Sequence, residues 1–316
     1  MVEKLKQIIA FIRLGNLALI ALYYFVFDTF LLWPIRVHVA QEPVLSPDDF
    51  NLLLLDVILV TVIGYWLNDW RDRAADKKNR PDRFLVKNEI KLGGFLILIG
   101  IPVIVGALIT LHLGIKTGNE KWTVLYPVVL ILLTVYAYRG KQMGLAGNVL
   151  VSMLIASLPA LLIIAERDLF NKLKASNNET YLSIVSLLMV YGSLMFFSNL
   201  ARELVKDCED LEGDTEVGSR SFPIQYGLPL TRWLISANIF LALVAQGFFV
   251  FQMANENATR IVAMVISMLL ISSFWLLFRG KVETNFRVLS QGLKLTMLLG
   301  IVQLAIYMLL EYSQIN

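Results

Sequence analysis

The sequence predicts an all-α membrane protein, a bundle of nine transmembrane helices, and three observations support this fold class. The 316 residues are 57% hydrophobic and only 17% charged, which is less charge than a soluble domain of this length carries. Long apolar segments recur along the chain, and about 20 apolar residues suffice to span a bilayer as a helix. The segments do not alternate polar and apolar residues as barrel strands do, so helices that satisfy their own backbone hydrogen bonds are expected.

The nine segments run along the whole chain, with no low-complexity stretch or interdomain linker between them. We therefore expect a single domain over residues 1–316. The first segment is long enough to span the membrane, so no cleavable leader is expected. The segments are Leu14–Trp33, Phe50–Leu67, Gly93–Leu113, Trp122–Tyr138, Leu145–Ala165, Tyr181–Leu200, Trp233–Phe251, Ile261–Phe278 and Gly292–Leu310.

The basic residues predict which side of the membrane each loop faces. With a cytoplasmic N-terminus, three quarters of the 28 lysine and arginine residues fall in cytoplasmic segments, in agreement with the positive-inside rule. We therefore expect a multi-pass protein of the cell inner membrane with its N-terminus in the cytoplasm. The net charge of +3 is too small to indicate a nucleic-acid partner.

Two cytoplasmic loops, after the second and the sixth segments, carry aspartates with the same spacing, D-x2-D-x3-D. Six of the chain's twelve aspartates lie in these two motifs, at Asp69, Asp72, Asp76, Asp207, Asp210 and Asp214. If the helices continue into the loops, spacings of three and four place the carboxylates on one face, where they repel one another unless a cation lies between them. Mg²⁺ binds one or two carboxylates and completes its shell with waters and substrate phosphates. The motifs therefore predict a magnesium and diphosphate site.

A simpler interpretation is that each loop is merely solvated, with basic residues and their counter-charges. The matching spacing in two loops, next to apolar spans where charge is costly, favours a functional site. Other metal chemistry is excluded by composition. The single cysteine, Cys208, excludes a disulfide and a cysteine zinc site, and the two histidines are isolated in the sequence.

The stretch N-D-x2-D-x3-D-x2-N-R-P at residues 68–81, the stretch R-E-x2-K-D-x2-D-x3-D at residues 202–214 and the nine spans together resemble the UbiA superfamily of intramembrane prenyltransferases. The resemblance implies that metal is bound by Asp72, Asp76, Asp207, Asp210 and Asp214. It implies catalytic roles for Asp72, Asp76, Asp210, Asp214 and Lys141. It implies substrate contacts from Asn68, Asp69, Arg80, Arg83, Tyr138, Arg202, Glu203 and Lys206.

Several of these residues also have a structural alternative. Lys141 is equally suited to anchor the chain at the cytoplasmic face, and Tyr138 to the interfacial aromatic belt. In the structural alternative, Arg80 and Arg83 only add charge to the loop. Glu203 and Lys206 lie within one helical turn and, in that alternative, only stabilise the helix as a pair.

The family resemblance implies a Mg²⁺-dependent transfer of a prenyl group from a prenyl diphosphate to a lipid or aromatic acceptor, with membrane lipids around the protein. Within the family, residues 79–83 and 202–214 look most like digeranylgeranylglyceryl phosphate synthase-like members, which implies geranylgeranyl transfer to geranylgeranylglyceryl phosphate. The eight basic residues of the first loop favour such a phosphate-bearing acceptor. Two departures, Phe84–Lys87 after the first motif and Ser221–Pro223 after the second, leave the acceptor open.

Two alternatives remain at this point. One is prenylation of an aromatic quinone, haem or chlorophyll precursor. The other is a membrane transporter with cytoplasmic acidic gates, although a transporter places its site near the midplane, whereas these acids follow the spans. The sequence lacks the D-G-x2-A-R motif of a CDP-alcohol phosphotransferase, and a soluble terpene synthase lacks the spans.

Overall fold

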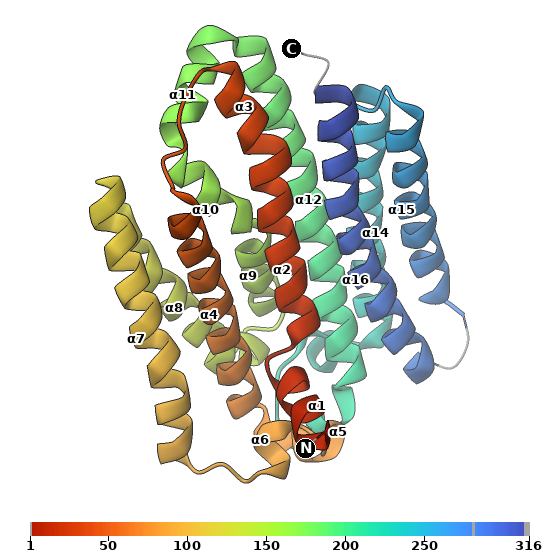
Figure 1. Cartoon of the computed structure of the whole chain (residues 1–316). Helices are drawn as coiled ribbons and strands as arrows, with labels where there is room; N and C mark the ends of the chain where they lie inside the picture. The colour runs from red at the N-terminus through yellow and green to blue at the C-terminus, as the bar shows by residue number, and fades with distance from the viewer. Residues whose placement is uncertain (1, 280–281, 313–316) are drawn as a thin grey trace. The chain divides into compact units, whose positions relative to one another are not determined.

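A computed structural model describes residues 2–279 and 282–312, and within them it contains helices and no β-strand (Figure 1). Nine helical segments of the described residues are long and apolar enough to cross a membrane, which confirms the predicted fold class. They are Leu14–His38, Pro47–Arg71, Leu92–Thr117, Lys121–Arg139, Leu145–Ala165, Asn178–Glu209, Phe222–Gln252, Asn257–Leu276 and Asn285–Leu310.

The chain forms two compact units, each built from separate stretches of the sequence. Unit 1 contains residues 1–22, 44–147 and 212–221, and unit 2 contains residues 23–43, 148–211 and 222–316. The first aspartate motif lies in unit 1. The second motif is divided, because Asp207 and Asp210 belong to unit 2 and Asp214 belongs to unit 1. The expectation of one domain over residues 1–316 stays a prediction.

In unit 1, the long helix α4 (Pro47–Arg71) packs against α7 (Leu92–Thr117) and α8 (Lys121–Arg139) (Figure 1). Short helices α1 (Val2–Phe11), α5 (Arg73–Asn79) and α6 (Phe84–Lys87) lie near the C-terminal end of α4.

Stacked aromatic rings join α4 to α1 and α7, and α1 to α6. The ring of Phe11 lies 5.0 Å from Trp66 and 4.5 Å from Phe84, and Trp70 lies 4.1 Å from Phe95. Such pairs stabilise by more than their area alone, so the cluster holds the chain that carries the first motif.

In unit 2, the central helix is α12 (Asn178–Glu209), which packs against α14 (Phe222–Gln252), α16 (Val282–Tyr307) and α11 (Arg167–Ser176). Helix α15 (Asn257–Leu276) packs against α14 and α16 (Figure 1). The second motif begins on the last turn of α12, so this packing positions Asp207.

Some spans are interrupted where the sequence predicts one continuous segment. The fifth span consists of α9 (Leu145–Ala156) and α10 (Leu158–Ala165), with Pro159 at the start of α10, because proline cannot donate a helix-interior hydrogen bond. The first span consists of α2 (Leu14–Val26), the π-helix η1 (Phe27–Leu32) and α3 (Trp33–His38).

The seventh span starts earlier than the predicted Trp233. Helix α14 begins at Phe222 and has a kink at Gly227, whose φ of 80° and ψ of 161° suit glycine alone.

Candidate active site

Both aspartate motifs interrupt a helix at their middle aspartate. Helix α4 ends at Arg71, Asp72 has φ −81° and ψ 0°, and α5 begins at the next residue. Helix α12 ends at Glu209, and Asp210 has φ −92° and ψ 4°. Helix α13 (Leu211–Glu216) then carries the last aspartate. Both junctions lie in the bridge region, where many active-site residues are found.

The continuous helix on which the expectation of a common carboxylate face depended is therefore absent in both motifs. The first and third aspartates of each motif lie on different helices, because the chain changes direction at the second. The two motifs therefore share a helix break at the second aspartate as well as the spacing of their aspartates.

In unit 1, Arg83 joins the first and third aspartates of the first motif. Its Nη1 donates to Asp69 Oδ1 at 2.6 Å and to Asp76 Oδ2 at 2.9 Å. Arg13 also donates to Asp69, at 2.5 Å. The carboxylates of Asp69 and Asp76 are 8% and 5% exposed, and buried carboxylates need such pairing. Arg83, which we expected at the substrate, thus contacts two motif carboxylates.

Asp76 lies in an environment that is unfavourable for a charged carboxylate. Burial raises the pKa of its carboxyl to about 6, the charge of Arg83 opposes this rise, and the charges of Asp72 and Asp69 add to it. The charge of Arg80 also lowers this pKa, and the expected contact of Arg80 with substrate stays a prediction. A carboxylate in this situation is stabilised by additional positive charge.

The middle aspartate of the first motif is oriented by Asn68. The Asn68 Nδ2 donates to Asp72 Oδ2 at 3.0 Å across one turn at the end of α4. Both side chains are half-buried, so Asp72 keeps access to solvent while one of its oxygens is held. The predicted pair of Asn68 and Asp72 therefore lies together.

The tail of the second motif docks on the end of the first within unit 1. Asn79 Oδ1 accepts a hydrogen bond from the backbone N–H of Gly213 at 3.0 Å. Lys78 forms ion pairs with Glu212, at 2.9 Å, and with Glu216. Asp214, the next residue along α13, is fully buried. These contacts bring Asp214 to the unit that contains the first motif.

In unit 2, polar side chains of α12 and α9 lie near Asp207, the first aspartate of the second motif. Glu203 pairs with Arg202 at 3.1 Å and with Lys206 at 2.5 Å. This is the helix pair that we considered as the alternative to a substrate contact.

Asp207 accepts a hydrogen bond from Asn148 Nδ2 at 2.7 Å. Ser152 donates to the Asn148 carbonyl at 2.7 Å, and Asn199 donates to Ser152 at 3.1 Å. This chain of hydrogen bonds fixes Asp207.

The structure adds three residues to which sequence reasoning gave no role: Arg13, Asn79 and Asn148. Arg13 is 56 residues from Asp69 and Asn148 is 59 residues from Asp207, so no local pattern links them. Asn79 had a signal, because it belongs to the N-R-P stretch at the end of the first motif.

Two predicted residues are less closely defined. Tyr138 is 46% exposed near the end of α8. The backbone of Lys141 lies in the 3-10 turn η2 (Gly140–Gln142), but its side chain lies outside the described part of the chain.

The donors suit Mg²⁺, although the described part of the chain holds no preformed three-ligand cluster. Among the described residues, no group of three His, Cys, Asp or Glu side chains lies close enough to hold a metal ion. Mg²⁺ requires only one or two protein carboxylates when phosphates and waters supply the other ligands. The half-buried Asp72 and the buried Asp76 are oxygen donors of that kind, so the residues fit the ion.

Residues 29–299 match the UbiA prenyltransferase family, and the chain belongs to that family. Digeranylgeranylglyceryl phosphate synthase of Methanospirillum hungatei is 31% identical over 63% of this chain, and the match spans only 62% of that relative's length. Digeranylgeranylglyceryl phosphate synthase of Methanothermobacter thermautotrophicus is 25% identical over 81% of this chain and 85% of the relative.

Solved structures show the same fold at lower sequence identity. A structure described as giving insights into digeranylgeranylglyceryl phosphate synthase in membranes has a TM-score of 0.62 at 21% identity, covering 97% of this chain and 99% of that chain. A UbiA homologue from Archaeoglobus fulgidus, bound to DMAPP and Mg²⁺, has a TM-score of 0.51 at 16% identity, covering 92% of this chain and 98% of that chain.

These comparisons confirm the predicted family, and with it a prenyltransferase rather than a transporter. They also confirm a multi-pass membrane protein.

Proposed function

We propose that the chain transfers a geranylgeranyl group from its diphosphate to a glycerol phosphate ether lipid such as geranylgeranylglyceryl phosphate, with Mg²⁺ as cofactor. The observation that carries the proposal is the pair of matching aspartate motifs, each broken at its middle aspartate, in a chain of the UbiA family. The names of the relatives from Methanospirillum and Methanothermobacter support the lipid acceptor.

The aspartates of both motifs have the task of holding the metal and, through it, the diphosphate. The residues that would hold Mg²⁺ are Asp72, Asp76, Asp207, Asp210 and Asp214, and the ion, when bound, neutralises the negative charge that develops on the diphosphate. Asn68 and Asn148 keep Asp72 and Asp207 in place through hydrogen bonds of 3.0 and 2.7 Å. Preorganised groups of this kind lower the barrier because they need not reorient during the reaction.

In the transfer, the bond between C1 of the prenyl chain and the diphosphate oxygen breaks, and the acceptor hydroxyl oxygen forms a bond to C1. The hydroxyl proton is lost and diphosphate leaves. Arg80, Arg202, Lys206 and Lys141 have the role of stabilising that leaving group by their charge. The apolar spans exclude bulk water, which would otherwise capture the allylic cation.

The first loop contributes fewer unengaged basic residues than its sequence suggests. Arg83 binds two motif aspartates, Lys78 binds α13, and Arg73 stacks over Trp70 at 3.7 Å. The basic residues of this loop therefore support a phosphate-bearing acceptor less than their number in the sequence suggests. The names of the relatives carry that part of the proposal.

The positive-inside bias supports placing the N-terminus and both motifs in the cytoplasm of a cell with the protein in its inner membrane. Prenyl diphosphates are charged and water-soluble at one end, so a cytoplasmic site suits their delivery.

The experiment is a competition in one reaction. Purified protein, labelled geranylgeranyl diphosphate and Mg²⁺ are incubated with equal amounts of geranylgeranylglyceryl phosphate and 1,4-dihydroxy-2-naphthoate. We expect label in the ether lipid, and none when EDTA replaces Mg²⁺. Label in the aromatic acid alone would assign the chain to the quinone-forming branch and refute the lipid acceptor.

A further inference from the structure

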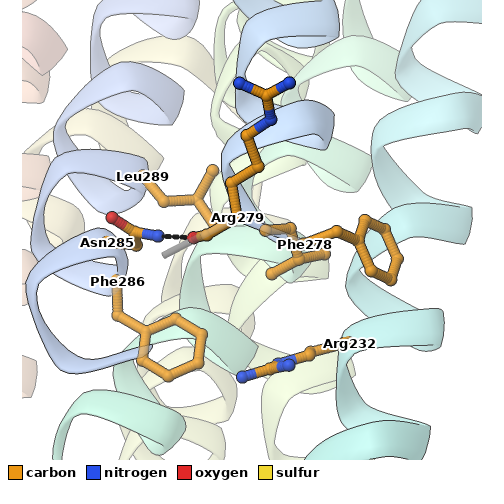
Figure 2. Close-up of a pocket in the computed structure, with 7 residues that line it drawn as sticks. Arg232, Phe278, Arg279, Asn285, Phe286 and Leu289 are labelled. Carbon is orange, nitrogen blue, oxygen red and sulfur yellow. Dashed lines mark hydrogen bonds between the residues drawn. The ribbon is translucent and has the colours of Figure 1, made fainter. Parts of the chain in front are cut away.

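A pocket in unit 2 lies between the helices α14, α15 and α16, and the charge of its residue Arg232 reaches Cys208 of the second motif. The space between its walls is partly open to solvent. Its walls come from α14, the turn after α15 and the start of α16 (Figure 2). The lining residues are Arg232, Leu277, Phe278, Arg279, Asn285, Phe286 and Leu289.

Arg232 has no counter-charge among the described residues. Its Nε is buried without a hydrogen-bond partner, and no carboxylate of the described residues lies within 4.0 Å of its guanidinium. A buried donor without a partner costs about 1–3 kcal/mol, and more when the group is charged. An anion in the pocket would remove that cost.

Arg279 is arranged differently. Its guanidinium lies 3.7 Å above the ring of Trp275, and in Figure 2 it extends away from Arg232. The Arg279 carbonyl accepts a hydrogen bond from Asn285, which closes the turn between α15 and α16. Arg279 therefore forms the wall of the pocket mainly by its backbone, and Arg232 supplies the charge.

The pocket has a position between two span ends, which favours the depth of the lipid headgroups. It joins the end of the span Asn257–Leu276 to the start of the span Asn285–Leu310. Trp233 and Trp275 are 65% and 51% exposed beside it, and Trp233 packs edge-on against Phe278 at 5.9 Å. Exposed tryptophans are typical of the membrane–water interface, and basic pockets between transmembrane helices at this depth bind phosphorylated headgroups.

We propose that this pocket binds the phosphate of a membrane lipid through the Arg232 guanidinium. Arginine matches phosphate oxygens with two parallel N–H donors, and Leu277, Phe286 and Leu289 provide an apolar wall for the adjoining chain. The lipid is either an anionic lipid of the surrounding bilayer or the phosphate-bearing acceptor. Only the second source rests on the proposed function.

The first measurement is lipid binding to the purified full chain in neutral detergent, by native mass spectrometry. Phosphatidylglycerol carries the phosphate, and diacylglycerol with the same acyl chains lacks it. We expect the wild type to retain phosphatidylglycerol in preference to diacylglycerol. Arg232→Gln should lower the apparent affinity for phosphatidylglycerol roughly tenfold, the loss expected for a charge-assisted hydrogen bond, with no change for diacylglycerol.

Two further variants control this measurement. Arg167→Gln removes an exposed arginine at the start of α11, also in unit 2, and should leave binding unchanged. Arg232→Lys keeps the charge but loses the two-donor geometry, so it should bind phosphatidylglycerol with an affinity between those of the wild type and Arg232→Gln. Size-exclusion profiles and thermal unfolding in neutral detergent show whether each variant is folded. If Arg232→Gln does not fold, the phosphatidylglycerol affinity of Arg232→Lys tests the proposal.

The second measurement distinguishes the two sources. In vesicles of uncharged lipid, KM for geranylgeranylglyceryl phosphate rises roughly tenfold in Arg232→Gln, with kcat unchanged, if the acceptor occupies the pocket. If a bilayer lipid occupies it, KM stays at the wild-type value while phosphatidylglycerol binding falls. Wild-type phosphatidylglycerol affinity together with wild-type KM in both Arg232 variants would overturn the proposal. A wild type inactive with this acceptor would refute the proposed function, and the binding measurement would still test the pocket.

Discussion

Asn79 and Gly213 are 134 residues apart, yet the side-chain oxygen of Asn79 accepts the backbone N–H of Gly213 at 3.0 Å. A Cβ at Gly213 would lie 2.5 Å from that same oxygen, so only glycine permits the approach. The contact joins α13, which carries Asp214, to the end of α5, which carries Asp76. The approach of Asn79 to position 213 therefore forms a hydrogen bond and also requires glycine there.

The first prediction concerns this pair. Gly213→Ala should lower kcat/KM, because relieving the overlap displaces α13 at a cost of about 1–3 kcal/mol. Asn79→Ala should cost about 1 kcal/mol through the lost hydrogen bond. In the double variant the added methyl group has room, so Gly213→Ala should be less harmful on the Asn79→Ala background.

The measurement is a double-mutant cycle of prenyl transfer at several Mg²⁺ concentrations. Coupled residues give an interaction energy of about 0.5–3 kcal/mol. Strictly additive effects would show that the contact does not position the motif. Gly118→Ala is a matched control: no atom lies within 4 Å of its Cβ position, so any effect of that variant reports the strain of its positive φ and not crowding.

The second prediction concerns the junction aspartates. Asp72→Ala and Asp210→Ala should each abolish prenyl transfer while the protein still folds and inserts, because each removes an oxygen donor for metal without emptying the core. The assay is transfer of labelled geranylgeranyl at saturating Mg²⁺, with size-exclusion chromatography to check folding. Asp82→Ala, an exposed aspartate of the same loop, should stay active. Full activity in both junction variants would remove these residues from the site.

The third prediction follows from the pKa of Asp76. Its value of about 6 in the folded protein, against 3.8 for the free side chain, means that folding disfavours the ionised form. The stability that the neutral carboxyl of Asp76 confers relative to the ionised carboxylate is fully present below pH 3.8 and is lost as the pH rises through 6. At pH 7.5, ionised Asp76 therefore lowers the free energy of unfolding by roughly 3 kcal/mol. The neutral side chain of Asp76→Asn avoids this loss.

The unfolding temperature in neutral detergent with EDTA tests this sign. Asp76→Asn should unfold at a higher temperature than the wild type at pH 7.5, and the difference should shrink toward pH 5. Adding Mg²⁺ should stabilise the wild type more than the variant, because a bound cation offsets the same cost. A difference that is independent of pH would show that burial of the Asp76 charge does not destabilise the fold.

The fourth prediction concerns topology. The only cysteine, Cys208, is buried, so a Cys208→Ala background allows single cysteines to be introduced at exposed sites. Lys77→Cys on α5 should react with a membrane-impermeant maleimide only after the cells are permeabilised. Lys172→Cys on α11 should react in intact cells. The reverse pattern would place the aspartate motifs outside the cytoplasm, where they would not meet a cytoplasmic diphosphate.

The sequence by itself determined the number of spans, the fold class and the positions of the two motifs. Apolar length decides whether a segment can cross a bilayer, and this property is local, so nine predicted segments correspond to nine helical spans in the described residues. The repeated spacing of the aspartates is likewise a property of the sequence alone.

The tertiary structure decided what surrounds each aspartate. Spacing predicts a common face only while a helix continues, and the chain instead breaks at Asp72 and Asp210. The pairing of Arg83 with Asp69 and Asp76, and of Asn148 with Asp207, depends on how separate helices pack. Such contacts join residues far apart in the chain or across a turn, and their geometry is set by the side chains packed between the helices and not by any local periodicity.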